Sequence, residues 1–508
     1  MPASNSSYDL DTILPGVTEA YAALRSPSRS GLQTSTGSFY NHTLFGRDAS
    51  MAAKFVSDFD HDIVVETIIA LAELQGSQYN SRTQEQPGRI HHEFRDFRTW
   101  KSTFFERIPF IVLNQKWDIR DRRLLSYFSL DTTSSYIRLV HKHATRIDRA
   151  ILDRSTTNHH GHTQTIEQSI VAAAEWIMDK VNDRGLVGEW RRNPWSLPFQ
   201  TFQDSLYARR DRSLVNYTDF TTYVEVQALA ADALYDMAHL LPRHEKAQIW
   251  RETALRMHQS MIHEFSNEDG FLASAIDSRG VVDVANVSAG WTLNTSLWDE
   301  MSIADRSHHI GAIVERLFSS GFLTNVGLRT RSRMVPDPVK HSVDYHGSET
   351  VWPMFSFMVV EGLRRHRLYE LAQQLENRII NGLNATGGFP EFHIVRRNGS
   401  LILPAKSRFS PTLQVHMKPE QNIAFSVVPG VVMARRSIEL GGKLAQLPWQ
   451  AELEKRVLEK IKHIDRADPS SAIDAVGPVV HLHLRRWSAG LRTIYYFWKE
   501  KRRIDKNS

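Results

Sequence analysis

Apolar residues recur at helical spacing along most of this chain. In residues 60–75, for example, Val64, Ile68 and Leu71 fall on one helical face. Thr132 stands at the beginning of another such segment, where a hydroxyl side chain caps a helix well. The pattern predicts amphipathic helices over residues 47–58, 60–75, 132–152, 163–182, 219–241, 244–265, 303–319, 346–365, 367–383, 421–440, 445–463 and 484–501.

The segments between these helices are long and contain Gly, Pro and aromatic residues, as functional loops in a compact fold usually do. Strand-like pieces are short and local, as at 392–395 and 401–403, and the chain has no βαβ alternation. A ring of paired helices with its loops gathered at one end accounts for this pattern, so the expected fold class is all-α. We expect an N-terminal extension over residues 1–40 and a single domain over residues 41–508.

Composition excludes some classes of function. Of the 508 residues, 41% are hydrophobic and 10% aromatic, which is enough for a large core. The 62 basic residues nearly balance the 57 acidic ones, so the net charge of +5 does not by itself indicate nucleic-acid binding. Cysteine is absent, which excludes disulfides, thiolate catalysis and cysteine-ligated metals. Without a signal-peptide pattern or an apolar run of ~18 residues, we expect a soluble, cytoplasmic protein.

Two carboxylates stand out because each occurs in a loop beside aromatic residues. Glu391 lies within residues 387–392, and Asp204 lies within residues 199–205. Glycoside hydrolysis uses two carboxyl groups, of which one protonates the leaving oxygen and the other activates water or attacks the sugar. Aromatic neighbours such as Phe202 offer faces for sugar rings and would raise the pKa of Asp204 by desolvation. The two residues are therefore candidates for these roles.

Each candidate also has an ordinary structural explanation. An Asp before Ser, as at Asp204, commonly forms an Asx turn, and a Pro-Glu step after two glycines, as at Glu391, is commonly an exposed turn. Asp48 would suit the first turn of a helix, and Asp131 would suit an N-cap. Trp352 would suit the hydrophobic core. The residues alone leave both explanations open.

Eight loop segments occur in an order that resembles a known family. They are FGRD at 45–48, QPGRIHHEFR at 86–95, YFSLDTT at 127–133, FQTFQDS at 199–205, VEVQ at 224–227, GLRT at 327–330, YHGSETVWP at 345–353 and GFPE at 388–391. The series resembles the amylo-α-1,6-glucosidase (glycogen-debranching) family and the related group of glucosidases and mannosylglycerate hydrolases, over residues 40–440. This resemblance implies an (α/α)6 barrel whose loops form the active site at one end and which hydrolyses α-glycosidic bonds with inversion.

The resemblance also implies roles for individual residues. It makes Asp204 the general acid and Glu391 the general base, whose ionised form would be favoured by His393 or Arg396 nearby. It places a larger set of residues around the bound sugar, namely Phe45, Arg47, Asp48, Glu93, Arg95, Asp131, Phe202, Gln203, Glu225, Gln227, Arg329, His346, Gly347 and Trp352.

The chain departs from this family's pattern in three ways. Phe202 replaces a tryptophan of the acid loop, and Met-Phe-Ser at 354–356 replaces a polar run. Many relatives also carry an N-terminal β-sandwich that helps to bind polymer, whereas the barrel pattern here begins near residue 41. We therefore expect a small α-glucoside, an α-mannoside or a short oligosaccharide as substrate, cleaved at its non-reducing end.

Two other features were weighed for further chemistry. The histidine clusters at 91–92, 141–143, 159–162 and 481–483 lack the spacing of a zinc motif, so we expect no catalytic metal and no organic cofactor, while a bound calcium stays open. The basic and aromatic segment 484–503 would suit a membrane surface or RNA. A barrel helix with a basic C-terminal end is the favoured interpretation.

The sequence thus predicts an inverting glycosidase that acts on a small carbohydrate, has no nucleic-acid or membrane partner, and has an oligomeric state that stays open. A mannosylglycerate- or trehalose-type hydrolase is the alternative within the same clan. A carbohydrate-binding toroid without turnover is the alternative from another class, and a basic helical protein that binds nucleic acid is a third.

Overall fold

Helices dominate the described part of the chain. The computed structural model describes residues 9–25, 31–37, 40, 43–96, 117–119, 123–190, 193, 196–197, 199–203, 209–211, 213–216, 219–335, 345–402, 419–439 and 443–467. The predicted acid Asp204 and the predicted helix over 484–501 lie outside these residues. The helix-rich character agrees with the prediction, although the described residues also form small antiparallel sheets.

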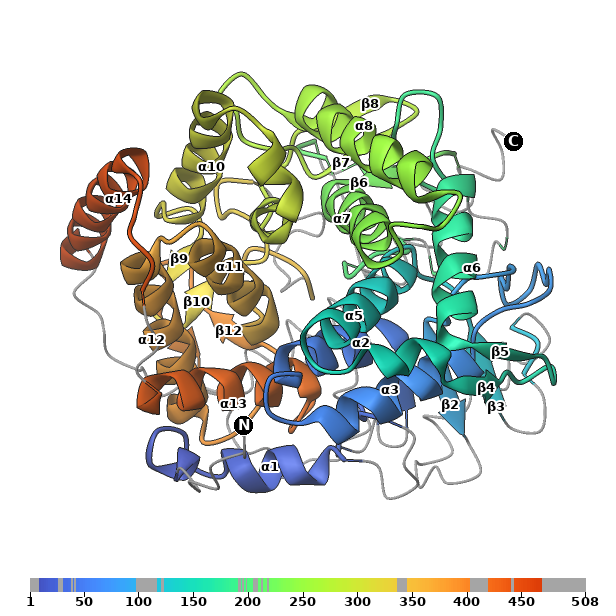
Figure 1. The fold of residues 1–508 in the computed structure, drawn as a ribbon. Helices are drawn as coiled ribbons and strands as arrows, with labels where there is room; N and C mark the ends of the chain where they lie inside the picture. Colours follow the sequence, from blue (N-terminus) through green and yellow to red (C-terminus); the bar gives the residue numbers. More distant parts are fainter. Residues whose placement is uncertain are drawn as a thin grey trace.

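One set of helices packs in a closed circle. It comprises α2 (Gly46–Val56), α5 (Thr132–Arg146), α7 (Val224–Leu240), α9 (Ser288–Trp291), α11 (Pro353–Arg365) and α13 (Ala424–Ile438). Each of these helices contacts the next one along the chain, and α13 contacts α2 again. Figure 1 shows α2, α5, α7, α11 and α13 around the middle of the molecule. The contacts therefore form an inner ring.

A second set of helices covers the outside of this inner ring. It comprises α1 (Val17–Ala23), α3 (His61–Glu73), α6 (Ile166–Asp179), α8 (Ala247–Phe265), α10 (Ile303–Leu317), α12 (Tyr369–Thr386) and α14 (Pro448–Ala467). α3 packs on α2, α6 on α5, α8 on α7, α10 on α9, α12 on α11, and α1 on α13. α14 lies farther out, against α10 and α12 (Figure 1). This double layer is consistent with an α/α-barrel.

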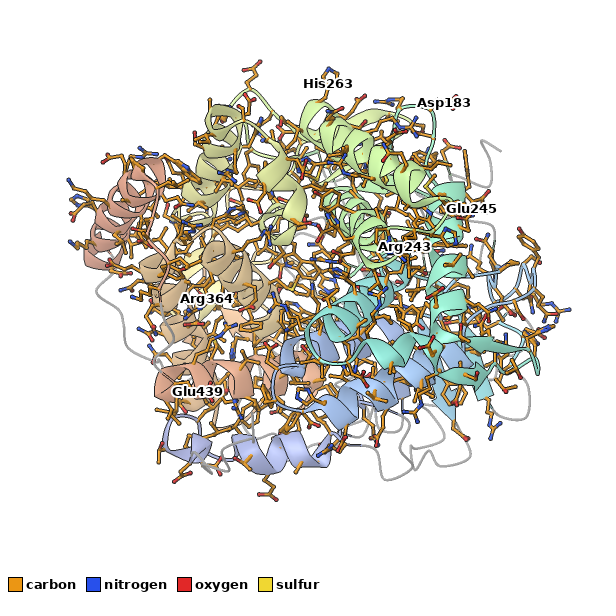
Figure 2. The ribbon with its side chains drawn as sticks, in the orientation of Figure 1. Asp183, Arg243, Glu245, His263, Arg364 and Glu439 are labelled. Atoms are coloured by element: carbon orange, nitrogen blue, oxygen red, sulfur yellow. The ribbon has the colours of Figure 1, made fainter. Side chains whose placement is uncertain are left out.

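The distribution of apolar residues explains the double layer. The outer helix α3 buries one stripe, formed by Val64, Ile68 and Leu71, as its period predicted. The inner helices α7 and α11 are buried on nearly all sides. Polar side chains such as Glu245 and His263 are exposed and lie toward the periphery in Figure 2. In the described part, no helix is both long and apolar enough to cross a membrane.

Short strands precede several inner helices and shift their predicted beginnings. They are β1 (Thr43–Phe45), β2 (Glu93–Asp96), β3 (Arg123–Ser126), β4 (Ser155–Thr157), β5 (Thr163–Thr165), β6 (Thr222–Tyr223), β7 (Ala275–Asp277), β8 (Gly280–Val282), β9 (Leu323–Thr324), β10 (Gly327–Leu328), β11 (Thr350–Val351), β12 (His393–Val395) and β13 (Leu401–Ile402). β6 pairs with β7, and β11 pairs with β12, so α7 and α11 begin later than predicted. Strands of two residues are too short to show a period of their own.

The described part of the predicted N-terminal extension packs into the same core as the ring. Leu14, Val17, Leu24 and Leu32 are fully buried in one cluster with the residues of the inner helices. Ser35 forms a β-bridge with Ile423, immediately before α13. This segment is thus part of the structural unit that holds the ring, and it reaches the ends of the inner helices.

Gly88 is a position where the fold tolerates no side chain. It has φ +82°, and a Cβ atom built there would lie 2.1 Å from the carbonyl oxygen of Ala172 on α6. We expect Gly88→Ala to lower the free energy of unfolding by about 3 kcal/mol or more, from backbone strain and overpacking together. Gly161 has φ +84° with no atom within 4 Å of the added Cβ, so Gly161→Ala should cost only about 1 kcal/mol. Denaturant unfolding measures the loss in free energy of unfolding for both variants. Equal losses in Gly88→Ala and Gly161→Ala would contradict this explanation.

Candidate active site

A pocket opens where several inner helices begin. Together with its open mouth, it spans about 410 Å³ of space that atoms do not fill. The first turns of α2, α11 and α13 contribute to its wall, together with the loops that precede them. The lining residues are Thr34, Tyr40, Phe45, Arg47, Asp48, Phe202, Tyr345, His346, Trp352, Phe355, Glu391, Ile423 and Phe425.

The pairing of β11 with β12 brings Glu391 into this pocket. Val351 pairs with His393 in an antiparallel register, so the residues just after β11 lie beside those just before β12. The rings of Trp352 and Phe392 are accordingly 5.4 Å apart. The hydroxyl of Tyr345 donates a hydrogen bond to Glu391 Oε1. Two segments that are separate in the sequence thus form one side of the pocket.

Glu391 occupies a buried position with few polar partners. Glu391 is 5% exposed. The backbone N–H of Glu420 donates a hydrogen bond to Glu391 Oε2 at 3.4 Å. Burial raises the pKa of Glu391 to about 8, against the lowering effect of the hydrogen bonds from Tyr345 and Glu420. The carboxylates of Glu420 and Asp48 raise the pKa further. Glu391 therefore binds a proton more strongly than an ordinary carboxyl group does.

The expectation that His393 helps to keep Glu391 ionised is wrong. Burial lowers the pKa of His393 to about 4, so its ring is neutral near pH 7 and supplies no positive charge. The sequence showed a histidine two positions from the carboxylate but could not show that β12 buries it. Tyr345 provides the hydrogen bond that favours the carboxylate form instead.

Stacked aromatic rings form the floor of the pocket. The rings of Trp352 and Phe355 are 4.9 Å apart with an interplanar angle of 10°, and His346 stacks on Trp352 at 5.0 Å. Phe202 stacks at 4.2 Å on Trp291, which belongs to α9. Burial, and then the positive charges of Arg47 and Arg331, lower the pKa of His346 well below its usual value, so the ring is neutral. The departures noted at Phe202 and Phe355 thus extend an aromatic surface on which a sugar ring can stack.

The opposite wall carries charge. Arg47 and Asp48 lie in the first turn of α2, and Arg47 Nε is 3.6 Å from Asp48 Oδ1. Arg47 Nη1 is also 3.4 Å from Asp131 Oδ2. Asp131 occupies the N-cap position of α5 but makes no capping bond with its side chain, and its Oδ1 accepts a hydrogen bond from Ser129 Oγ. The carboxylate of Asp131 is thereby available to orient Arg47.

Residues 199–203, the described part of the predicted acid loop, are held in place by hydrogen bonds. Gln200 Oε1 accepts a hydrogen bond from Arg89 at 3.0 Å, and Thr201 Oγ1 donates to Glu225 Oε1. Gln203 exchanges two hydrogen bonds with the side-chain amide of Asn286, at 2.6 and 3.0 Å. Burial raises the pKa of Glu225 to about 8. These contacts fix the backbone up to the residue before Asp204, whose own position lies outside the described residues.

Other predicted residues lie around the pocket without lining it. Arg95 Nη2 is 2.7 Å from Glu93 Oε1, and its guanidinium lies over the ring of Tyr40, which does line the pocket. Gln227 donates to the carbonyl oxygens of Gly185 and Met257, and Arg329 donates to those of Ser348, Arg396 and Arg397. These two side chains hold loop backbones. The predicted residues outside the described lining are Glu93, Arg95, Asp131, Gln203, Glu225, Gln227, Arg329 and Gly347.

Sequence reasoning missed several residues that line the pocket. Tyr345 and Phe355 stood in or next to the YHGSETVWP segment, so a wider choice within that segment would have included them. Ile423 and Phe425 begin α13 just as Arg47 begins α2, and the ring arrangement would have indicated them. Thr34 and Tyr40 carried no signal, because they belong to the segment taken as an extension.

Comparisons with known proteins identify the family and the fold of this chain. A protein-family model described as the mannosylglycerate hydrolase MGH1-like glycoside hydrolase domain matches residues 139–395. Two structures of a GH63 mannosylglycerate hydrolase from Thermus thermophilus, in complex with glucose and with Tris, are both 14% identical to this chain, with TM-scores of 0.55 and 0.56. They match 83% of this chain and 99% and 100% of their own lengths.

A further solved structure, described as a wild-type glycosidase, is 13% identical with a TM-score of 0.52, over 84% of this chain and 98% of its own. At these identities, the likeness shows a shared fold. The search of curated proteins found no match.

Proposed function

The chain belongs to the mannosylglycerate hydrolase MGH1-like family of glycoside hydrolases, and from this premise we propose that it cleaves the α-glycosidic bond of a small carbohydrate with inversion. The helices would form an (α/α)6 barrel, with the pocket at the end where the inner helices begin. The match includes the acid loop, the residues from Tyr345 to Trp352, and Glu391. It therefore covers most of the segments that carry the proposed chemistry.

The proposed roles are those of a general base for Glu391 and a general acid for Asp204. One observation carries this proposal: Phe202, which lies just before Asp204 in the chain, lines the same pocket as Glu391. Two loops that are distant in sequence thus contribute to one cavity. An inverting enzyme needs its carboxyl groups roughly 6.5–9.5 Å apart, with a water molecule between the base and the sugar.

The geometry of Glu391 suits the activation of water. Its carboxylate accepts a proton readily, because burial favours the neutral form, and Tyr345 holds Oε1 in a fixed direction. Among the described residues, Glu420 donates the one hydrogen bond to Oε2, a long one of 3.4 Å from its backbone N–H, so Oε2 is the oxygen that we assign to water. The proton from water would pass to Glu391 as the new bond to the anomeric carbon forms, while Asp204 protonates the departing oxygen.

The pocket favours a substrate with one well-enclosed sugar. Trp352, Phe355 and Phe202 offer aromatic surface to the apolar side of a ring, while Arg47 and Asp48 offer partners for hydroxyl groups. The matching family model is named for mannosylglycerate hydrolysis, in which one sugar is cleaved from a small aglycone. We therefore place an α-mannoside or α-glucoside of a small aglycone, such as mannosylglycerate, ahead of trehalose or a glycogen branch.

A substrate panel tests this function directly. We expect the purified protein to hydrolyse one of mannosylglycerate, kojibiose, other α-linked disaccharides, trehalose, short maltooligosaccharides and branched dextrins. Proton NMR of the first product should show the β-anomer. Release of the α-anomer would contradict inversion. Sugar binding without hydrolysis of any member would instead favour a carbohydrate-binding toroid.

A further inference from the structure

A cluster of two histidines and a glutamate lies apart from the residues that line the pocket. Glu85 belongs to the loop after α3, and His159 and His160 lie in the turn between β4 and β5. His160 Nε2 is 2.8 Å from Glu85 Oε1, and His159 Nε2 is 3.7 Å from the same oxygen. Within the described residues, each of these three side chains offers one atom that can bind a metal ion. The three atoms all lie within 4.8 Å of one another.

The backbone holds both sides of this cluster in place. Asn158 Oδ1 accepts hydrogen bonds from the backbone N–H groups of His160 and His162, each at 3.0 Å. Gly161, at φ +84°, completes the tight turn. On the other side, Ser77 N donates to Glu85 Oε1 at 3.1 Å. The backbone of the histidine turn and the carboxylate of Glu85 are therefore held by separate contacts.

The spacing of the donor atoms suits a small metal ion. Zinc bonds of ~2.0–2.1 Å in tetrahedral geometry place neighbouring donors about 3.3–3.4 Å apart. The two distances from Glu85 Oε1, 2.8 and 3.7 Å, lie on either side of this value. The Glu85 side chain is 5% exposed and the histidine side chains are 22% and 26% exposed, which leaves room for water on the histidine side. The backbone N–H of His159 donates a hydrogen bond to the carbonyl oxygen of Glu73 at 2.8 Å, which ties the turn to the end of α3.

We propose that Glu85, His159 and His160 form a structural binding site for a divalent transition-metal ion, with Zn²⁺ as the leading candidate. Two imidazole nitrogens and one carboxylate oxygen suit zinc and its first-row neighbours, whereas calcium and magnesium prefer all-oxygen sites. The sequence shows no zinc motif for this site, because its ligands come from a loop and a hairpin turn that are far apart in the chain. The alternative is that Glu85 only accepts hydrogen bonds from His159 and His160. In that case the protein would not bind a metal ion selectively at this cluster.

The site would stiffen the support of the predicted acid loop. Gln84 precedes Glu85 with an unusual φ of 58°, and its Oε1 accepts a hydrogen bond from Gln200 at 2.5 Å. Arg89, in the same loop, also donates to Gln200. A metal at Glu85 would therefore restrain the loop that contacts residues 199–203.

Metal titration of the full-length protein tests this proposal. After dialysis against a chelator, the wild-type protein should bind one equivalent of Zn²⁺, as measured by competition with a chromophoric chelator. His160→Ala should weaken this binding by more than ~100-fold, since loss of even an outer partner costs about 10–100-fold. His308→Ala should leave it unchanged, because His308 and His309 form another adjacent pair, outside the three-residue cluster. Equal Zn²⁺ affinity in wild type and His160→Ala would overturn the proposal, as would the absence of binding by the wild type.

A second variant separates metal binding from folding. Glu85→Gln keeps the shape of the side chain and removes its charge, and circular dichroism would establish that the protein is folded. The visible spectrum of Co²⁺ should show intense bands of low coordination number in the wild type and lose them in Glu85→Gln. Zn²⁺ should raise Tm in the wild type but not in Glu85→Gln, and Mg²⁺ should do neither. A Co²⁺ spectrum unchanged by this substitution would also refute the assignment.

Discussion

Glu391→Gln is expected to lower kcat by about 10²–10⁴-fold, which is the usual contribution of a general base. Glutamine keeps the shape of the side chain and can still accept a hydrogen bond from Tyr345, but it cannot take a proton from water. The measurement is the initial rate on whichever α-glycoside the panel identifies. Asp204→Asn should cause a comparable loss if that residue is the acid. A Glu391→Gln enzyme with near wild-type kcat would contradict the assignment.

The same substitution should make the protein more stable, which separates lost chemistry from lost fold. Burial raises the pKa of Glu391 from 4.5 to about 8, so the folded state keeps a proton that the unfolded state releases between these pH values. The contribution of Glu391 to stability is therefore full below about pH 4.5 and is lost as the pH rises to about 8. Glutamine does not titrate, so it avoids this loss.

We expect the difference in unfolding free energy between Glu391→Gln and the wild type to grow from pH 5 to pH 8, and to reach the order of a few kcal/mol. Thermal unfolding at a series of pH values measures it. Glu245→Gln is the matched control, since Glu245 is exposed and lies outside the pocket lining. A Tm difference that stays constant with pH would show that Glu391 has an ordinary pKa.

Local periodicity was sufficient to predict most helices of this fold but not its ring. Val64, Ile68 and Leu71 are buried together because one stripe of a helix must face the core, and this follows from spacing alone. The closure of the ring depends on contacts between α13 and α2, at opposite ends of the chain, which no local pattern contains. The short α9 was not predicted either, because four residues are too few to show a period.

The candidate site, like the fold, could be predicted from the sequence only in part. Phe45, Arg47 and Asp48 were indicated by a segment that opens a helix, and they line the pocket. The bond from Tyr345 to Glu391 depends on the pairing of β11 with β12, and the two-residue strand β11 is invisible to sequence patterns. The raised pKa of Glu391 depends on burial by several elements, so it could not be predicted from the residues beside it. The catalytic roles of Glu391 and Asp204 stay predictions until the variants are measured.

The pH dependence of kcat/KM should identify the role of Glu391. This parameter reports the pKa values of the free enzyme. If Glu391 is the base, it must be ionised to act, so kcat/KM should rise by about tenfold per pH unit and level off near pH 8. The rise would end at a lower pH if the general acid loses its proton there. If Glu391 were the acid instead, kcat/KM would fall as the pH rises through the same value.

Two variants should move this ascending limb in opposite directions. Tyr345→Phe removes a hydrogen bond that lowers the pKa of Glu391, so the limb should shift to higher pH. Glu420→Gln removes a negative charge that raises this pKa, so the limb should shift to lower pH, with more activity at pH 6 relative to the plateau. Because both variants leave Glu391 in place, the plateau rates should change much less than in Glu391→Gln. The loss of a hydrogen bond to the carboxylate and the loss of a nearby negative charge change the pKa of a single carboxyl group in opposite directions. Shifts of the limb in the same direction, or no shift, would therefore show that a group other than Glu391 controls it.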